Sequence, residues 1–355
     1  MLRRIFNREF ASAIKRIKSY SVTCENKFCD YAENEESNAP SDESWRILFF
    51  GSDKFAAESL KALHSKYKDK KLVRHLEIVT AYQGQENCLT KYARKNKIPL
   101  HVWPPEISEG KFDIGIVVSF GHLIPEKIIN KFPLGMINVH ASLLPRWRGA
   151  APICHALING DTYTGISIMK IAPKKFDIGS VIMQQRIEIH PDDTQIELYD
   201  KLSKLGAEVL LRTVDKLPNI LNSAQSQDEK EVSNAPKITK DTSFVNWAIM
   251  TAKNVCDLQR GLNGIYPLRT YFNNVPVKIL NVKLVTDTSN IPHVHEKTPG
   301  ITVYDKSTKK LYVCCKDDTW VSVEKIVIPD HRPLNSQAFG SGYIMNTKEK
   351  YCLFG

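Results

Sequence analysis

The stretch GMINVHASLLPRWRGAAPICHALINGD, residues 135–161, contains the pattern from which the fold of most of the chain can be predicted. Its apolar start, 136–139, predicts a short buried strand, and 151–159 predicts a helix after a loop. The same alternation extends back to Trp45, with further strands expected at 47–50, 78–81, 100–102 and 114–118, and helices at 55–63, 89–97 and 125–131. Short buried strands that alternate with helices predict an α/β fold, a doubly wound, Rossmann-like parallel sheet, which we assign to residues 45–221.

Ligands of such sheets bind beyond the carboxyl ends of the strands, which directs attention to the loops 51–55, 119–122 and 138–149. In the last loop, Asn138 and His140 are two residues apart, so both side chains emerge on one face of the strand. Asn138 can stabilise a developing oxyanion while His140 moves a proton, and Asp177, between two apparent strands, could bring a carboxylate to the histidine. This set suits attack on a carbonyl. The alternative is a histidine that satisfies backbone groups of its own loop.

Several classes of site and protein are excluded by the same sequence. Gly51 stands alone, without the glycine-rich patterns of NAD- or ATP-binding loops. Cysteine and histidine spacings do not resemble a metal site, so no metal is expected. No apolar run reaches the roughly 18 residues of a membrane-spanning helix. Eight cysteines among 355 residues are too sparse for a disulfide-stapled secreted scaffold.

The first residues are typical of a targeting segment. Residues 1–24 carry six Lys or Arg and one acid, and their apolar residues recur at helical spacing: Phe6, Phe10, Ala13, Ile14 and Ile17. An amphipathic, basic, acid-poor leader indicates a mitochondrial transit peptide. The alternative is a basic surface helix of the mature fold. Residues 25–44 carry seven acids and one Lys and are predicted to be a linker.

A second domain is expected after a polar interdomain linker at 222–236. A long helix is predicted before this linker, at 196–217. After the linker, a helix is predicted at 245–261, followed by strands at 268–272, 275–284, 300–304, 311–315 and 321–328. Short strands separated by turns predict a small β-barrel within 237–355. Of the formal net charge of +10, residues 236–355 contribute +6, which suits a surface for a polyanion or simply a solvated, lysine-rich surface.

The motif NVHASLLPRWRGAAP, residues 138–152, resembles the signature of the N10-formyltetrahydrofolate-dependent formyltransferase family. The resemblance runs from Trp45 to the C-terminus and includes FFGS (49–52), DTYTGISIM (161–169) and KITKD (237–241). The part NxHxSLLP also fits members that act on glycinamide ribonucleotide. The extension RWRGAAP and the basic C-terminal domain favour members that formylate methionyl-tRNA.

The resemblance implies that Asn138, His140 and Asp177 are catalytic. It implies N10-formyltetrahydrofolate as formyl donor, methionyl-tRNA as acceptor, an OB-like C-terminal barrel that contacts the tRNA, no metal, and a monomer that serves initiation of translation in the mitochondrial matrix. The expected folate contacts are Ser142, Leu143, Leu144, Pro145, Phe120 and Gly121. The expected substrate or tRNA contacts are Gly51, Ser52, Phe55, Arg146, Arg148, Lys278 and Lys283, with Lys309, Lys310, Lys325, Arg260 and Arg269 as further candidates for phosphate contacts.

The chain departs from the family pattern in two places. Bacterial members carry a basic insertion after the second strand, whereas residues 81–87 contain no Lys or Arg. The family motif LDTGD is FDIGS at 176–180, which keeps the Asp and the Gly. Two alternatives stay open: a formyltransferase that acts on a small amine such as a ribonucleotide or amino sugar, and a non-catalytic RNA-binding protein with this fold.

Overall fold

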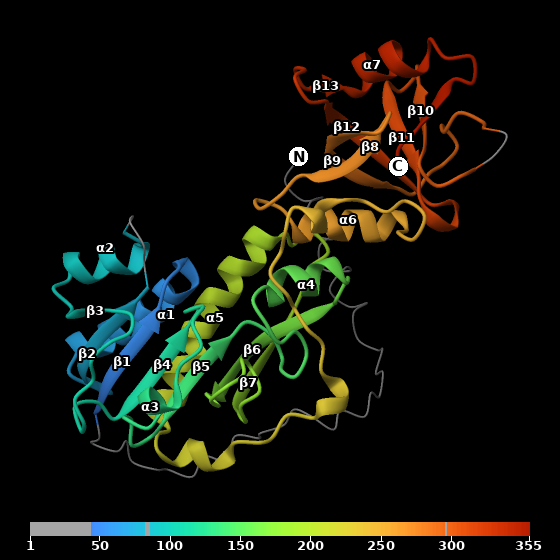
Figure 1. The fold of residues 1–355 in the computed structure, drawn as a ribbon. Coiled ribbons are helices and arrows are strands. Elements are labelled where there is room, and N and C mark those ends of the chain that lie inside the picture. The colour runs from blue at the N-terminus through green and yellow to red at the C-terminus, as the bar shows by residue number, and fades with distance from the viewer. Residues whose placement is uncertain (1–43, 82–85, 295–296) are drawn as a thin grey trace, which may run out of the picture. The chain divides into compact units, whose positions relative to one another are not determined.

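The computed structural model describes residues 44–81, 86–294 and 297–355. The predicted transit peptide, nearly all of the acidic linker, and residues 82–85 of the loop after the second strand lie outside these residues. The described chain forms an α/β domain with one seven-stranded sheet, followed by a second domain built on an antiparallel sheet (Figure 1).

The first sheet has the strand order β3-β2-β1-β4-β5-β6-β7. The pairs among its first five strands are parallel, whereas β6 and β7 join the β5 edge antiparallel. These strands are β1 (Trp45–Gly51), β2 (Val73–Thr80), β3 (Leu100–Val102), β4 (Ile114–Val118), β5 (Met136–His140), β6 (Tyr163–Lys170) and β7 (Val181–Glu188). The doubly wound class predicted from the sequence is confirmed.

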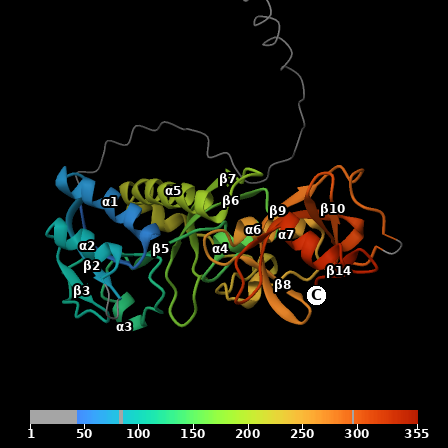
Figure 2. The ribbon, with the colours of Figure 1, turned by 90° about the horizontal axis from the view of Figure 1, so that it is seen from above.

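Helices cover both faces of this sheet because its central strands are apolar on both sides. Alternate residues of β1 divide between two cores: Ile47 and Phe49 join one, Leu48 and Phe50 the other. The helices of this domain are α1 (Lys54–Lys68), α2 (Cys88–Lys95), α3 (Glu126–Ile129), α4 (Pro152–Ile158) and α5 (Gln195–Asp215). Helices α1 and α5 pack against the first core, and α3 packs against the second (Figure 2).

The second domain is a curled antiparallel sheet with the order β14-β10-β11-β12-β9-β8. Phe354, directly after β14, forms a bridge with Phe272 of β8, so the two outer strands of this order meet and the sheet closes on itself. Its elements are α6 (Ala252–Gly261), β8 (Leu268–Phe272), β9 (Val275–Val285), β10 (Ile301–Asp305), β11 (Lys310–Cys314), β12 (Trp320–Val327), β13 (Leu334–Asn335), α7 (Ser336–Phe339) and β14 (Tyr351–Leu353). The predicted small barrel is thus confirmed.

One helix begins later than its sequence pattern indicated. The apolar spacing predicted a helix over 245–261, but α6 starts after Thr251, which forms a capping box with Asn254. Val245 and Trp247 are buried, and the Val245 N–H donates to the carbonyl of Arg269, a residue of β8. Val245 is buried beside β8 and Trp247 in a separate turn at 247–249, so the apolar residues before Thr251 reflect tertiary packing and not a helix.

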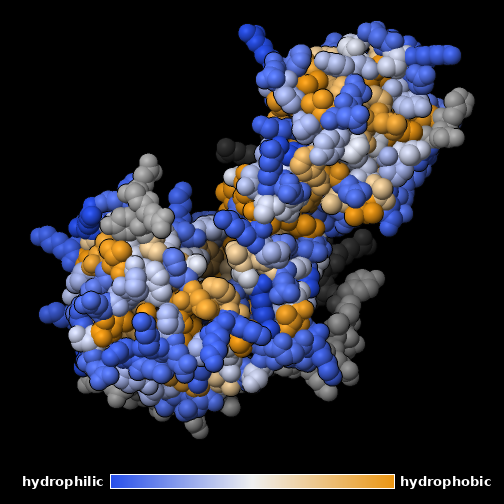
Figure 3. All heavy atoms as spheres, in the orientation of Figure 1, coloured by the Kyte–Doolittle hydropathy of each residue, from blue (hydrophilic) through white to orange (hydrophobic). Residues whose placement is uncertain are grey.

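The surface facing the viewer in Figure 3 is mostly hydrophilic, with smaller hydrophobic patches among the charged groups. Among the described residues, no helix has both the length and the apolar character needed to cross a membrane.

Gly165 of β6 provides a test of the packing between the sheet and the loop after β5. A methyl group there would lie 2.6 Å from the Leu143 side chain and would also collide with the backbone carbonyl of Gln185. We expect Gly165→Ala to lower the free energy of unfolding by about 1–3 kcal/mol, because a backbone atom cannot yield easily. Urea unfolding measures the change. Gly342→Ala is the control, since an added methyl there meets nothing within 4 Å; equal stability losses in both variants would contradict this packing.

Candidate active site

Three loops leave the same edge of the first sheet, at the carboxyl ends of β1, β4 and β5. The Ser52 hydroxyl lies 3.5 Å from the Phe120 carbonyl, which links the first two loops. Asp53 caps α1 by accepting from the Ala56 N–H at 3.0 Å. Burial raises the pKa of the Asp53 carboxyl, against hydrogen bonds from Ala56, Tyr199 and neighbouring groups that lower it. The loop after β1 is therefore fixed by the Asp53 cap and by hydrogen bonds to Phe120 and to Tyr199 of α5.

Asn138 and His140 emerge from β5 on one side, opposite Ile137 and Val139, which belong to the core under α1 and α5. His140 is 6% exposed, whereas Asn138 is half-buried. Within the described ranges, no hydrogen bond joins the Asn138 carboxamide to another protein group. Its N–H groups are therefore available to a bound molecule.

The two ring nitrogens of His140 have different neighbours. Nε2 lies 2.9 Å from the Trp147 carbonyl oxygen, and Nδ1 lies 3.7 Å from Oδ1 of Asp177. A carbonyl can only accept a hydrogen bond, so Nε2 carries hydrogen. Nδ1 is left as the nitrogen that can take up and release a proton, beside a carboxylate. The ring thus makes the contact with its own loop that the alternative interpretation expected, while its other nitrogen faces Asp177; a catalytic role of His140 stays a prediction.

Asp177 reaches the site from the connection between β6 and β7. Its backbone is left-handed, with φ of +56°, a conformation that Asp tolerates better than most residues. The carboxylate is only 10% exposed, and its Oδ2 accepts from the Gly149 N–H at 2.9 Å. The structure thus joins Asp177 both to His140 and to the loop after β5.

The expected folate contacts divide by exposure. Ser142 and Leu144 are buried, and the Ser142 hydroxyl donates to the Arg146 carbonyl at 2.6 Å. Leu143 and Pro145 are partly exposed. The apolar surface that this loop offers a ligand therefore comes from Leu143 and Pro145, while its other two residues hold the loop in shape.

In the loop after β4, Phe120 is buried and makes an edge contact with Trp103 at a centroid distance of 5.1 Å. Gly121 is exposed and left-handed, with φ of +75°. Phe120 therefore supports the loop from inside, and Gly121 is the one of this expected pair that a ligand can reach.

Three of the expected substrate or tRNA contacts have internal roles instead. Arg148 is 9% exposed, and its guanidinium donates to Gln227 and Glu229. Phe55 is 3% exposed and packs edge-on against Tyr199. A side chain at Gly51 would collide with Ala56, so this glycine serves close packing. The structure shows internal contacts for these three residues, and their contact with substrate or tRNA stays a prediction.

Other expected contacts stay accessible. The Arg146 side chain is 47% exposed, although it donates to both carboxylate oxygens of Asp161 and lies 4.3 Å above the Trp147 ring. Lys278 and Lys283 are exposed on β9. Arg260, a further phosphate candidate, pairs with Asp257 at 2.8 Å and has a largely buried side chain, which corrects that expectation.

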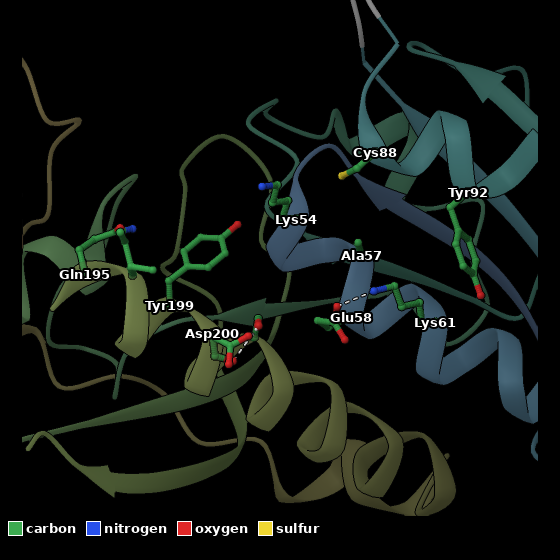
Figure 4. A pocket seen from close by; sticks show the side chains of 11 residues that line it. Lys54, Ala57, Glu58, Lys61, Cys88, Tyr92, Gln195, Tyr199 and Asp200 are labelled. Carbon is green, nitrogen blue, oxygen red and sulfur yellow. Dashed lines mark hydrogen bonds and ion pairs between the residues drawn. The ribbon is translucent and has the colours of Figure 1, made fainter. Parts of the chain in front are cut away.

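A cavity of about 530 Å³ lies near the same edge, between α1, α2 and the start of α5 (Figure 4). Lys54, Glu58, Tyr92 and Tyr199 are among the side chains that line it. It is on the α1 and α5 side of the sheet, whereas Asn138 and His140 point to the other side. The cavity therefore does not contain the predicted catalytic side chains.

In the described part of the chain, no group of three or more His, Cys, Asp or Glu side chains is placed to hold a metal ion.

Two residues missed by the sequence analysis help to shape the site. Trp147 is buried and left-handed, with φ of +63°; its ring N–H donates to Asp161 at 2.7 Å. Its backbone N–H donates to the hydroxyl of Ser233 at 2.9 Å. Ser233 belongs to the predicted interdomain linker, and no local pattern signals a contact across 86 residues.

Comparison with known proteins covers both domains. Sequence profiles of the formyl transferase family and of the formyl transferase C-terminal domain match residues 45–214 and 237–343, respectively. The mitochondrial methionyl-tRNA formyltransferase of Bos taurus is 38% identical over 309 residues, which cover 84% of this chain and 78% of that protein. The protein of the same name from Mus musculus is 40% identical over 307 residues, with the same coverage of both chains.

A solved structure has the same fold. The N-formyltransferase from Helicobacter canadensis, in complex with folinic acid and dTDP-3-aminofucose, aligns with a TM-score of 0.59 at 16% identity. The alignment covers 78% of this chain and 98% of that chain. At this identity the likeness concerns the fold.

The hydrogen-bond pattern of His140 predicts its tautomer. When the ring is neutral, we expect hydrogen on Nε2 and none on Nδ1, because the Trp147 carbonyl can only accept. Nitrogen-15 NMR of selectively labelled histidine distinguishes the two forms, with His140→Gln used to assign the resonance. The exposed His122 provides a reference in the same spectrum. A neutral His140 with hydrogen on Nδ1 would show that the loop is arranged differently.

Proposed function

The chain belongs to the formyl transferase family, and from this premise we propose that it transfers a formyl group from N10-formyltetrahydrofolate to the amino group of methionyl-tRNA. The product, formylmethionyl-tRNA, serves initiation of translation in mitochondria. The substrate and the compartment follow from relatives of 38–40% identity that are named mitochondrial methionyl-tRNA formyltransferases and align with 84% of the chain. We place the enzyme in the matrix.

The observation that carries the chemical part of the proposal is the arrangement of Asn138, His140 and Asp177. Asn138 offers an unpaired carboxamide, while Nδ1 of His140 faces a carboxylate at 3.7 Å. These three groups together can stabilise a negative oxygen and move a proton, which are the two requirements of acyl transfer to an amine. An RNA-binding protein without activity needs neither.

Each residue has a defined task in the proposed reaction. N10-formyltetrahydrofolate supplies an electrophilic formyl carbon. The Asn138 carboxamide donates to the formyl oxygen as that oxygen gains negative charge. Nδ1 of His140 takes the proton that the attacking amine loses and returns it to the leaving nitrogen, so one C–N bond forms as another breaks. Asp177 stabilises the positive charge that the ring holds in between.

The residues around the site fit a folate. Leu143 and Pro145 present partly exposed apolar surface beside the histidine loop, and Gly121 is exposed on the neighbouring loop. The flat faces of the pterin ring can pack against such an apolar wall, while polar groups around it fix its orientation. We assign these three residues to folate binding, with Ser142, Leu144 and Phe120 as their internal support.

We further propose how the tRNA is held. Lys278 and Lys283 lie exposed on β9 of the basic C-terminal domain and would contact phosphates. Arg146, close to the site and half-exposed, would contact the acceptor stem near the aminoacyl end, together with Ser52. Because one chain contains the whole trio, we propose that the monomer is active.

For the chain as a whole, we propose a transit peptide at 1–24 and an acidic linker at 25–44. The catalytic domain then covers 45–221, the interdomain linker 222–236, and the tRNA-binding domain 237–355.

Formyl transfer from N10-formyltetrahydrofolate to methionyl-tRNA tests the reaction and the role of Asn138. We expect transfer by the parent protein, and Asn138→Ala should lower kcat by roughly 10²–10³-fold, because it removes an oxyanion donor. Tyr163→Phe, which removes an exposed hydroxyl, is the control and should keep full activity. Transfer to glycinamide ribonucleotide or an amino sugar but not to methionyl-tRNA would support the small-amine enzyme. Binding of tRNA without transfer to any amine would support the RNA-binding protein.

The salt dependence of tRNA binding tests the second domain. The logarithm of the affinity should fall linearly with the logarithm of salt concentration, and Lys278→Ala with Lys283→Ala should reduce the slope by up to about two. The double variant Lys70→Ala with Lys71→Ala is a control of equal charge, because both lysines are exposed and lie just before β2 in the first domain. Equal slopes for the two double variants, or a response that is flat in salt, would contradict the proposed phosphate contacts.

A further inference from the structure

The segment that the sequence marks as an interdomain linker also forms part of the candidate site. We call residues 225–235 the strap. At one end, Gln225 and Val181 exchange two backbone hydrogen bonds of 2.8 Å, just after the Asp177 loop. At the other end, the Arg148 N–H donates to the Ser233 carbonyl at 2.9 Å, and the Ala235 N–H donates to the Arg148 carbonyl at 2.7 Å. The strap therefore joins the Asp177 loop to the His140 loop.

Gln227, two residues after Gln225 in the strap, makes side-chain contacts with the Asp177 loop. Its amide nitrogen donates to the backbone carbonyls of Asp177 and Gly179, both at 2.8 Å. Its amide oxygen accepts from Nε of Arg148 at 2.9 Å. Both N–H groups and the oxygen of this side chain are thus used, and two of the three bonds end on the loop that carries the carboxylate.

The Asp177 loop requires such support because its backbone conformation is unfavourable. Asp177 is left-handed, with φ of +56°, and so is Lys174, with φ of +75°. Residues in this region persist only where surrounding contacts hold them. The Gln227 amide provides those contacts from the strap side and fixes the two carbonyls that flank Ile178.

The carboxylate of Asp177 is linked to the strap from its other end as well. It accepts from the Gly149 N–H, and Gly149 lies so close to the strap that an added methyl would be 2.6 Å from the Ala235 carbonyl. The backbone and the carboxylate of Asp177 are therefore both positioned by contacts that lead to residues 225–235. A change at Gln227 should move the carboxylate relative to His140.

We propose that Gln227 is a positioning residue of the formyl transfer: it holds the Asp177 loop so that the carboxylate faces Nδ1 of His140. The inference rests on the proposed function, and it assigns an active-site task to a residue outside both predicted catalytic loops. The competing explanation is that Gln227 only provides an acceptor for the buried Arg148.

Gln227→Glu separates these explanations. Glutamate has nearly the same volume and still accepts from Arg148, but it cannot donate to the carbonyls of Asp177 and Gly179 and would repel them. If Gln227 serves only Arg148, this variant keeps its activity. If it positions Asp177, the variant loses activity at least as severely as Gln227→Ala.

The kinetic experiment measures kcat and KM of the full chain for methionyl-tRNA. We expect Gln227→Glu to lower kcat by roughly 10–100-fold, the effect of losing two hydrogen bonds, with KM changed by less than about twofold. Gln225→Ala is the matched control, because its side chain is exposed and its backbone pairing with Val181 is retained. Full activity in Gln227→Glu, or an equal loss in the control, would overturn the proposal.

A double variant tests whether the effect passes through Asp177. Asp177→Asn should lower kcat by itself, and adding Gln227→Glu should then cause little further loss, because the group being positioned has already been changed. Losses that multiply would show that Gln227 acts independently of Asp177 and would overturn the proposal.

Amide hydrogen exchange separates a failure of this inference from a failure of the proposed function. The Gly149 N–H is bonded to the Asp177 carboxylate, so its exchange rate by NMR reports the position of that carboxylate without any substrate. We expect at least about tenfold faster exchange in Gln227→Glu and no change in Gln225→Ala. An unchanged rate in Gln227→Glu would overturn the positioning role. Absence of formyl transfer by the parent protein would instead overturn the proposed function.

Discussion

The hydrogen bond between Nε2 of His140 and the Trp147 carbonyl is the interaction on which the candidate site depends. It fixes the orientation of the ring. Because a carbonyl can only accept a hydrogen bond, Nε2 carries hydrogen, and Nδ1 is the nitrogen that faces Asp177. Trp147 presents its carbonyl from a left-handed conformation, with φ of +63°. Asp161 and Ser233 hold it there through its ring and backbone N–H groups. The orientation of the histidine ring thus depends on Trp147 and, through it, on Asp161 and Ser233.

The sheet and the loops contribute different kinds of precision. Strand β5 fixes Asn138 and His140 by regular pairing with β4 and β6, so their common side follows from strand geometry alone. Asp177 has no strand to place it, and its backbone is strained. It depends on bonds to Gly149 and Gln227. The site therefore pairs His140, which the sheet places, with Asp177, which contacts between distant residues place.

This division explains what the sequence could predict. Strands such as 114–118 are apolar throughout, so their burial is a local property, and the spacing of Asn138 and His140 is local too. The burial of Arg148 and the role of Gln227 depend on a bond between residues 79 positions apart, for which a polar linker sequence carries no signal. The late start of α6 has a similar cause, because Val245 and Trp247 are buried by tertiary packing, one paired with Arg269 of β8 and the other in a turn at 247–249.

The position of the strap constrains the joint between the two domains. An ordinary linker tolerates changes of length and composition, because its backbone is solvated and makes few contacts. Here the chain is paired with Val181 at Gln225 and with Arg148 at Ala235, so both ends of the interval have a fixed register against the loops that carry Asp177 and His140. An insertion between Gln225 and Gln227 would displace the Gln227 amide from the carbonyls of Asp177 and Gly179. The joint is therefore held at both ends by contacts with the loops that carry Asp177 and His140, in addition to connecting the two domains.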